Sequence, residues 1–259
     1  MTDGSSSGLP GERPGYSIGE AMGWSWTMFT RHAGLLVATT VILGILGVAI
    51  ATLLGSLLNT VSPESFSAIQ DGQDVVATAT RSIEGAGVAV LGLAWLAVLV
   101  VSGAIAAAWY GGLLSIADGK PVFFGSFFRP RNVASVVLAS LLIGVLSTVA
   151  LIALTVPYVG GVLTAATAAL VALVNFFTVV SIVDHNLSAV KGIRASVCAA
   201  TRHPGPVALA WIITTAVLAA GGLLCGGLLV AVPIAYLFKV FTWRRLTGGT
   251  VVQGPEALG

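Results

Sequence analysis

Long apolar stretches separated by short polar segments dominate this chain of 259 residues. Six stretches reach about 20 residues, the length that crosses a hydrocarbon layer about 30 Å thick as a helix. The predicted spans are residues 34–58, 87–110, 133–157, 160–184, 206–224 and 227–246. The last two depend on a turn near the sequence GGLLCGG, since the 41 residues from Pro206 to Leu246 accommodate two short helices.

Two segments outside the spans have the spacing of amphipathic helices. The first, SIGEAMGWSWTMFTRHAG, opens with Ser17 and Glu20, which have the spacing of a capping box. At helical spacing Ile18, Met22 and Phe29 share one face. We therefore predict a helix that lies on the membrane surface.

The second segment, SAVKGIRASVCAATRHPG, separates charged from apolar residues in the same way. Val190, Ile193 and Val197 fall on one side of the predicted helix, and Lys191 and Arg194 fall on another. We expect Lys191 and Arg194 to contact lipid headgroups or a partner protein.

Both segments end in Thr-Arg-His-x-Gly, as TRHAG at residues 30–34 and as TRHPG at residues 201–205. Arg31, His32, Arg202 and His203 therefore lie where the chain turns into the bilayer, and cations at this depth pair with lipid phosphates of any kind. The alternative is that these four side chains converge on one anionic headgroup or partner. A weaker third copy, VFFGSFFRPRNV, precedes the third span.

The repeat predicts an all-α fold, a polytopic membrane helical bundle. Its six transmembrane helices form three hairpins, each preceded by a cytoplasmic interfacial amphipathic helix. Residues 16–246 make up this domain. Residues 1–15 are rich in Gly, Ser and Pro and are expected to form a disordered tail, and residues 247–259 a flexible C-terminal tail.

Composition and charge support this arrangement and orient it. Hydrophobic residues make up 56% of the chain and charged residues 8%, against about 25% charged residues in soluble domains. With six spans, all of the 12 Lys and Arg residues except Arg81 fall on the side that holds both termini. The positive-inside rule therefore predicts a multi-pass membrane protein with both termini in the cytoplasm. The abundance of Ala, Val and Gly indicates a bacterial source with GC-rich genes, and hence the bacterial cytoplasmic (inner) membrane. Cys198 and Cys225 fall on opposite sides, so no disulfide is expected.

Aromatic residues gather near the predicted cytoplasmic boundary, where amphipathic rings are favoured. We interpret the set as an interfacial belt; the alternative is that the rings fill a core. The set is Trp24, Trp26, Phe29, Trp109, Tyr110, Phe123, Phe124, Phe127, Phe128, Phe241 and Trp243.

Polar side chains inside the predicted spans are few. Asn175 and Thr178 on the fourth span are the best candidates for a buried polar site. An interhelical hydrogen bond accounts for Asn175, and a contact with a substrate is the alternative. Lys239 lies close enough to the end of the sixth span to reach the lipid phosphates.

The residue spacing indicates no catalytic site, metal site or cofactor. Asp184 and His185 are adjacent and have the chemistry of an acid–base pair or half of a metal site. We favour a cap that ends the fourth span. The chain has no nucleotide-binding loop. We expect no enzymatic activity, no cofactor and no nucleic-acid partner.

The stretch FFTVVSIVDHNLSAVKGIRASVCAATRHPG, followed by Pro233 and YLFKVFTWRRL, resembles a broad family of bacterial integral membrane proteins. The family is named after the membrane domain of glycerophosphoryl diester phosphodiesterases, and its actinobacterial members are described as proline- and glycine-rich transmembrane proteins. The resemblance implies a six-helix membrane domain, although FTW departs from the usual tyrosine-bearing ending. We expect no phosphodiesterase domain, because only TGGTVVQGPEALG follows the last span.

Three functions are compatible with these features. The leading hypothesis is a non-catalytic membrane protein: an envelope scaffold, an accessory subunit or a lipid-handling component. Its partners would be anionic membrane lipids, other membrane proteins or further copies of the chain. The alternative is a transporter or permease component for a small or lipidic substrate, since transporter folds often repeat hairpin units. A continuous polar cavity reaching Asn175 would favour that alternative. The third, an enzyme acting on lipid phosphodiesters, rests on the resemblance alone.

Overall fold

The computed structural model describes residues 17–61, 86–128, 131–154, 161–224 and 226–252. The predicted N-terminal tail, the segment around Arg81, and Cys225 lie outside these ranges. All regular structure within them is helical, which confirms the all-α class. The elements are α1 (Ile18–Arg31), α2 (Ala33–Val61), α5 (Ala86–Ala117), the 3-10 helix η1 (Phe124–Phe128), α6 (Val133–Leu154), α7 (Gly161–Val174), α8 (Thr178–His185), α9 (Ala189–Arg202), α10 (Pro204–Leu223) and α11 (Leu228–Thr247).

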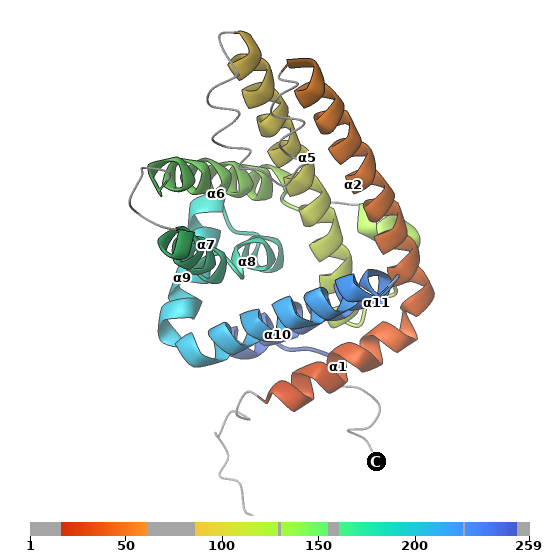
Figure 1. The fold of residues 1–259 in the computed structure, drawn as a ribbon. Coiled ribbons are helices and arrows are strands. Elements are labelled where there is room, and N and C mark those ends of the chain that lie inside the picture. The colour runs from red at the N-terminus through yellow and green to blue at the C-terminus, as the bar shows by residue number, and fades with distance from the viewer. Residues whose placement is uncertain (1–16, 62–85, 129–130, 155–160, 225, 253–259) are drawn as a thin grey trace, which may run out of the picture.

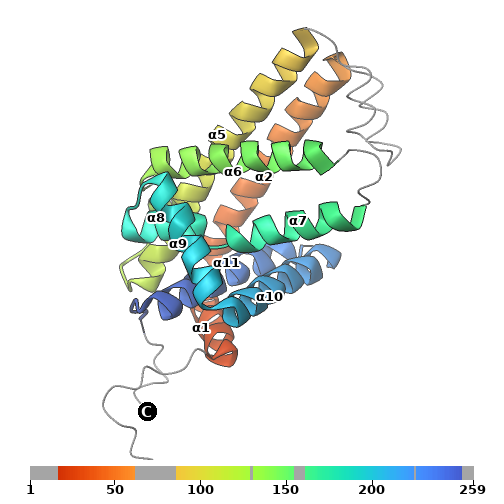
Figure 2. The same cartoon turned by 90° about the vertical axis from the view of Figure 1, so that its left-hand side faces the viewer.

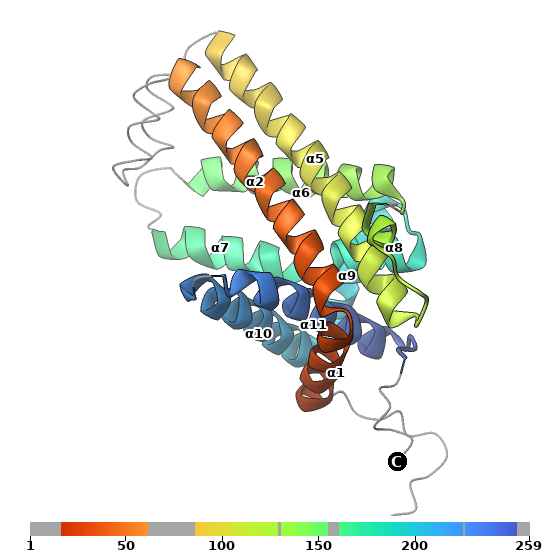
Figure 3. The same cartoon turned by 90° about the vertical axis from the view of Figure 1, so that its right-hand side faces the viewer.

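The helices fall into two groups with different directions. Figure 1 shows α2 and α5 side by side, running obliquely and extending beyond the other helices at one end. In Figures 2 and 3, α6, α7 and α10 lie one above another, and α2 and α5 cross this stack. The most extensive contacts join α5 to α6, α10 to α11, and α1 to α11. The first and last helices therefore meet at one end of the molecule.

Four helical segments of the described chain are long and apolar enough to cross a membrane. They are Ala33–Leu57, Ala89–Ala117, Ala168–His185 and Pro204–Leu223. Helix α6 has 22 residues and carries no charged side chain, whereas α11 carries Lys239, Arg244 and Arg245. Four long apolar helices support a multi-pass membrane protein, but this criterion does not show the six predicted spans.

The predicted fourth span, residues 160–184, is interrupted. Helix α7 ends at Val174 and α8 begins at Thr178. Ser196 of α9 satisfies the backbone at the break: its hydroxyl donates to the Val174 carbonyl at 2.6 Å and accepts from the Phe177 N–H at 3.1 Å. A buried hydroxyl thus replaces hydrogen bonds that a continuous helix would make internally. The structure therefore shows a break inside the predicted fourth span, whose segment Ala168–His185 is still long and apolar enough to cross a membrane.

The predicted aromatic belt separates into two groups. Exposed fractions of 55% for Trp26, 72% for Phe123, 42% for Phe124 and 48% for Phe128 agree with an outward belt. The other seven rings are buried in the protein core, which corrects our interpretation of the whole set as interfacial. In the core, rings of α1 and α11 and rings of α5 and η1 meet in tilted pairs. Trp24 lies 5.2 Å from Phe241, and Trp109 lies 5.4 Å from Phe127 of η1.

The two predicted surface helices also pack on protein. Helix α1 buries Ala21, Trp24, Ser25, Met28 and Phe29, chiefly against α11. Helix α9 buries the small residues Ala189, Gly192, Ser196, Ala199 and Ala200 against α8 and α6. The predicted apolar face of α9 is therefore not its buried face, since Val190 is 57% exposed. Close approach explains the difference, because a Cβ on Gly192 would clash with Ile182 of α8.

The outward halves of α2 and α5 have little protein around them. Ile45, Val48 and Leu53 on α2 are 65%, 68% and 71% exposed, and Leu93 on α5 is 68% exposed. Exposing so much contiguous apolar surface to water is unfavourable, whereas contact with lipid tails, which are as apolar as leucine, is not. We therefore expect these faces to contact the hydrocarbon layer.

Candidate functional site

An apolar cleft lies where α2 and α5 meet α11. Its volume is about 650 Å³. Helix α2 contributes Leu43 and Gly47 among others, and α5 contributes Ile105 and Trp109. Among the residues that the structure describes, none has an atom within 4 Å of a Cβ placed on Gly47, so this glycine leaves space open where a side chain would project. The cleft therefore results from small residues on α2 and the limited contact between α2 and α5.

The cleft continues along the two long helices. A second hollow of about 240 Å³ shares Ile50, Leu54 and Val98 with the first and extends to Ala94 on α5. From Ala94 to Tyr110, α5 advances about 24 Å at a rise of about 1.5 Å per residue. One leaflet of the hydrocarbon layer is about 15 Å deep, half of the ~30 Å core. The groove is therefore long enough to hold an acyl chain lengthwise.

A single lysine forms the polar end of the cleft. Val232, Tyr236 and Lys239 occupy one face of α11 at helical spacing, and all three line the cleft. The Lys239 Nζ lies 4.4 Å from the ring centre of Phe176. It also lies 5.5 Å from that of Tyr110 and 5.7 Å from that of Tyr236. Ring faces attract a cation at such distances, and so they hold the ammonium group at the cleft.

Tyr110 adds an unused hydrogen-bonding group at the same place. Its side chain lines the cleft and is 2% exposed. Its hydroxyl has no hydrogen-bond partner in the described structure. A buried hydroxyl without a partner costs free energy, so this position favours a bound polar atom.

A cluster of charges joins three helix ends below the cleft. Arg244 Nη2 on α11 lies 2.7 Å from Asp118 Oδ1 and 2.8 Å from Asp184 Oδ1. The side chains of Arg244 and Asp184 are each 10% exposed. Trp243 Nε1 donates to Asp184 Oδ2 at 3.2 Å, and Lys120 Nζ lies 2.9 Å from Asp118. The cluster links the end of α5 to α8 and α11.

Opposing effects set the ionisation of Asp118. Burial alone acts to raise the pKa of its carboxyl, but hydrogen bonds and positive charge from Lys120 and Arg244 outweigh burial. Its pKa is therefore lowered, and the carboxylate form is the one that the cluster stabilises.

The backbone after α11 folds against this cluster. Arg244 Nη1 donates to the Thr250 carbonyl at 3.0 Å, and the Val252 N–H donates to the Ala117 carbonyl at 3.1 Å. Trp24 Nε1 of α1 donates to the Val252 carbonyl at 2.8 Å. Residues 248–252, at the start of the tail expected to be flexible, thus connect α1, α5 and α11; residues 253–259 lie outside the described chain.

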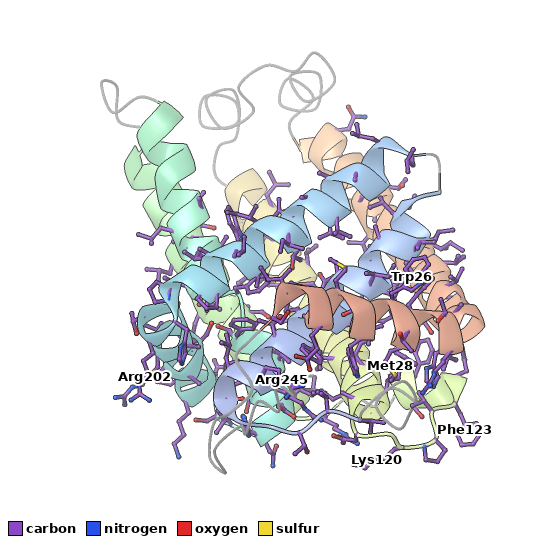
Figure 4. The ribbon with its side chains drawn as sticks, turned by 90° about the horizontal axis from the view of Figure 1, so that it is seen from below. Trp26, Met28, Lys120, Phe123, Arg202 and Arg245 are labelled. Atoms are coloured by element: carbon purple, nitrogen blue, oxygen red, sulfur yellow. The ribbon has the colours of Figure 1, made fainter. Side chains whose placement is uncertain are left out.

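The two Arg-His pairs are not brought together. Arg31 and His32 lie at the end of α1 next to α2, whereas Arg202 and His203 lie at the junction of α9 and α10, on the other side of the molecule (Figure 1). Figure 4 shows Arg202 projecting from one edge, with Trp26 and Phe123 toward the opposite edge. The four side chains do not converge on one headgroup, and separate contacts with lipid phosphates stay a prediction.

The other predicted site residues lie outside the cleft. Lys191 and Arg194 are exposed on α9. Asn175 and Thr178 do meet, with the Thr178 hydroxyl donating to Asn175 Oδ1 at 3.3 Å. Asn175 Nδ2 donates to the Val171 carbonyl at 2.9 Å, within the same segment. The expected interhelical hydrogen bond of Asn175 is therefore replaced by local bonds at the break.

Sequence reasoning missed the groups that form the site. It placed Lys239 within reach of the phosphates, but the ammonium lies among aromatic rings at the cleft. It treated Asp184 and His185 as a cap; α8 does end at His185, but Asp184 also binds Arg244. The sequence signal that could have identified these groups was the scarcity of charge near the spans. Where charges are few, each lysine within a span and each carboxylate at its boundary is a candidate for pairing.

Within the described residues, no group of three His, Cys, Asp or Glu side chains suits a metal ion.

Comparisons with known proteins show that the chain is similar to several mycobacterial proteins. Uncharacterized protein Mb2590 of Mycobacterium bovis and Uncharacterized protein MT2637 of Mycobacterium tuberculosis are each 32% identical to the chain. Uncharacterized protein Rv2560 of Mycobacterium tuberculosis is 31% identical. Each similarity extends over 245 residues, 92% of this chain and 71% of the relative. No protein-family model and no solved structure matches the chain.

Proposed function

We propose that this chain, which belongs to the family of these mycobacterial proteins, is a non-catalytic lipid-handling membrane protein. It would hold an acyl chain between α2, α5 and α11. The observation that supports this function is the long apolar cleft between helices suited to a membrane. Hydrocarbon would fill a space that water would occupy at a high free-energy cost. A scaffold or accessory subunit would not need such a groove.

For the membrane arrangement we propose six spans in three hairpins, with both termini in the bacterial cytoplasm. In support, the consecutive helices α2 and α5, α6 and α7, and α10 and α11 contact each other. Helices α1, η1 and α9 precede these pairs. Arg31, Arg202 and the exposed cations of α9 would then lie near anionic headgroups. The resemblance to the glycerophosphodiesterase membrane-domain family, which rests on Asp184, Pro233 and the residues around them, likewise implies six spans.

A transporter component is the second candidate. The break between α7 and α8 favours it, because discontinuous helices often form transport sites. Asn175 at this break does not line the cleft, however, and the cleft lining is predominantly apolar. A lipid-sized, apolar occupant fits this lining better than a small polar substrate.

Filling the cleft is expected to remove a bound lipid. Ala51 lines the cleft, so an indole side chain in the variant Ala51→Trp would occupy the volume assigned to the acyl chain. Native mass spectrometry of detergent-purified protein should show about tenfold less retained lipid, equivalent to about 1.4 kcal/mol.

Val48→Trp is the matched control, because Val48 lies on the same helix, is 68% exposed and does not line the cleft. This variant should retain lipid as the unmodified chain does. Equal retention in all three proteins would count against the proposed function.

A further inference from the structure

The polar end of the cleft identifies the charge of the occupant. We propose that the occupant is a long-chain fatty acid, an inference that rests on the proposed function. Its carboxylate binds the Lys239 ammonium and the Tyr110 hydroxyl, and its hydrocarbon chain extends along α2 and α5.

The first argument is an uncompensated positive charge. The described part of the chain contains three carboxylates, those of Glu20, Asp118 and Asp184. Glu20 pairs with Arg245, and both aspartates pair with Arg244. None remains for Lys239. A cation removed from water is stabilised by an anion more than by aromatic rings alone, so the cleft favours a negatively charged ligand.

The second argument is the number and type of hydrogen-bond donors. The Lys239 ammonium offers three N–H donors and the Tyr110 hydroxyl offers one. A carboxylate has two oxygens that only accept, and it can use both groups at once. Tyr110 is almost fully buried and its hydroxyl has no partner in the described structure. These side chains therefore form a small anion site at the end of an apolar groove.

The third argument is size. Three aromatic ring centres lie 4.4–5.7 Å from the Lys239 Nζ. Because the rings crowd the ammonium, a compact headgroup fits beside it better than a bulky one. A carboxylate is the smallest anionic headgroup that an acyl chain carries. A bulky phosphodiester headgroup fits these surroundings less well.

A binding series on the full chain in detergent micelles tests the proposal. The probes are palmitate, hexadecanol and palmitoyl-lysophosphatidate, which share a chain length and differ in headgroup. The unmodified chain should bind palmitate at least about tenfold more tightly than hexadecanol, because a charged hydrogen bond contributes about 1.5–3 kcal/mol. It should bind lysophosphatidate less tightly than palmitate.

Two substitutions separate the contributing groups. Lys239→Met keeps the apolar stem and should lower palmitate affinity about 10- to 100-fold, while leaving hexadecanol affinity unchanged. Tyr110→Phe removes only the hydroxyl and should lower palmitate affinity about 2- to 10-fold. Lys191→Met, which removes an exposed lysine of α9, is the matched control and should have no effect.

Some outcomes distinguish this proposal from the proposed function. If palmitate and hexadecanol bind the unmodified chain equally and Lys239→Met changes neither, the groove holds hydrocarbon and the anion site is overturned. Tighter binding of lysophosphatidate would overturn the carboxylate assignment. If no probe binds, both proposals fail. Should Lys239→Met not fold, Tyr110→Phe and the headgroup series on the unmodified chain still decide the question.

Discussion

Replacing Arg244 with methionine is expected to lower the free energy of unfolding by about 3–5 kcal/mol, the typical cost of removing one partner from a buried ion pair. The substitution leaves the carboxylates of Asp118 and Asp184 without the guanidinium that lies within 2.8 Å of both. It also removes the hydrogen bond to the Thr250 carbonyl, which holds the backbone after α11. The measurement is unfolding of purified protein in mild detergent, followed by near-ultraviolet circular dichroism.

The neighbouring arginine is the control for this effect. Arg245 pairs with Glu20, and their side chains are 26% and 42% exposed, against 10% for Arg244 and Asp184. Exposed ion pairs contribute about 0–1 kcal/mol, so Arg245→Met should change stability little. Equal losses in the two variants would mean that the cluster of Arg244, Asp118 and Asp184 does not stabilise the fold beyond an ordinary surface pair.

Replacing Ser196 with alanine is expected to be the second most damaging change. The Ser196 hydroxyl is fully buried and serves two backbone groups at the break between α7 and α8. Alanine leaves the Val174 carbonyl and the Phe177 N–H without this partner, at about 1–3 kcal/mol for each buried group. The same unfolding measurement should show the loss.

Ser188 provides the matched serine on the same helix. It is the N-cap of α9, is exposed, and its side chain makes no capping hydrogen bond. Ser188→Ala should therefore leave stability within about 0.5 kcal/mol. If Ser196→Ala is as mild as Ser188→Ala, the break between α7 and α8 is held by other contacts.

The sequence predicted the helices well because their signals are local. Ser17 does cap α1, with its Oγ accepting from the Glu20 N–H at 3.5 Å. The Arg-His pairs do end α1 and α9. The break at residues 175–177 was not predictable from the apolar run around it, because Ser196 of another helix stabilises it. The buried face of α9 was likewise determined by Gly192, which permits close approach to Ile182.

The candidate site depended on contacts that sequence spacing does not contain. Lys239 is on α11, Tyr110 on α5 and Phe176 next to α8, far apart along the chain. Asp118 and Asp184 end different helices and meet at Arg244 only after folding. Hydropathy placed Tyr110 and Lys239 near a membrane boundary and Asp184 at the end of the fourth span. Hydropathy does not show which helices pack against one another. That packing determines where a cleft or a charge cluster forms.

Photo-crosslinking tests most directly whether the groove between α2 and α5 holds an acyl chain. The reagent is a palmitate analogue with a diazirine midway along its chain, and mass spectrometry of peptides identifies the labelled residues. We predict adducts on Leu43, Leu54 and Ile105, which line the groove, and loss of these adducts in Ala51→Trp. Adducts confined to outward-facing residues such as Ile45 and Val48 would contradict the account, because these residues would contact surrounding lipid in any membrane protein.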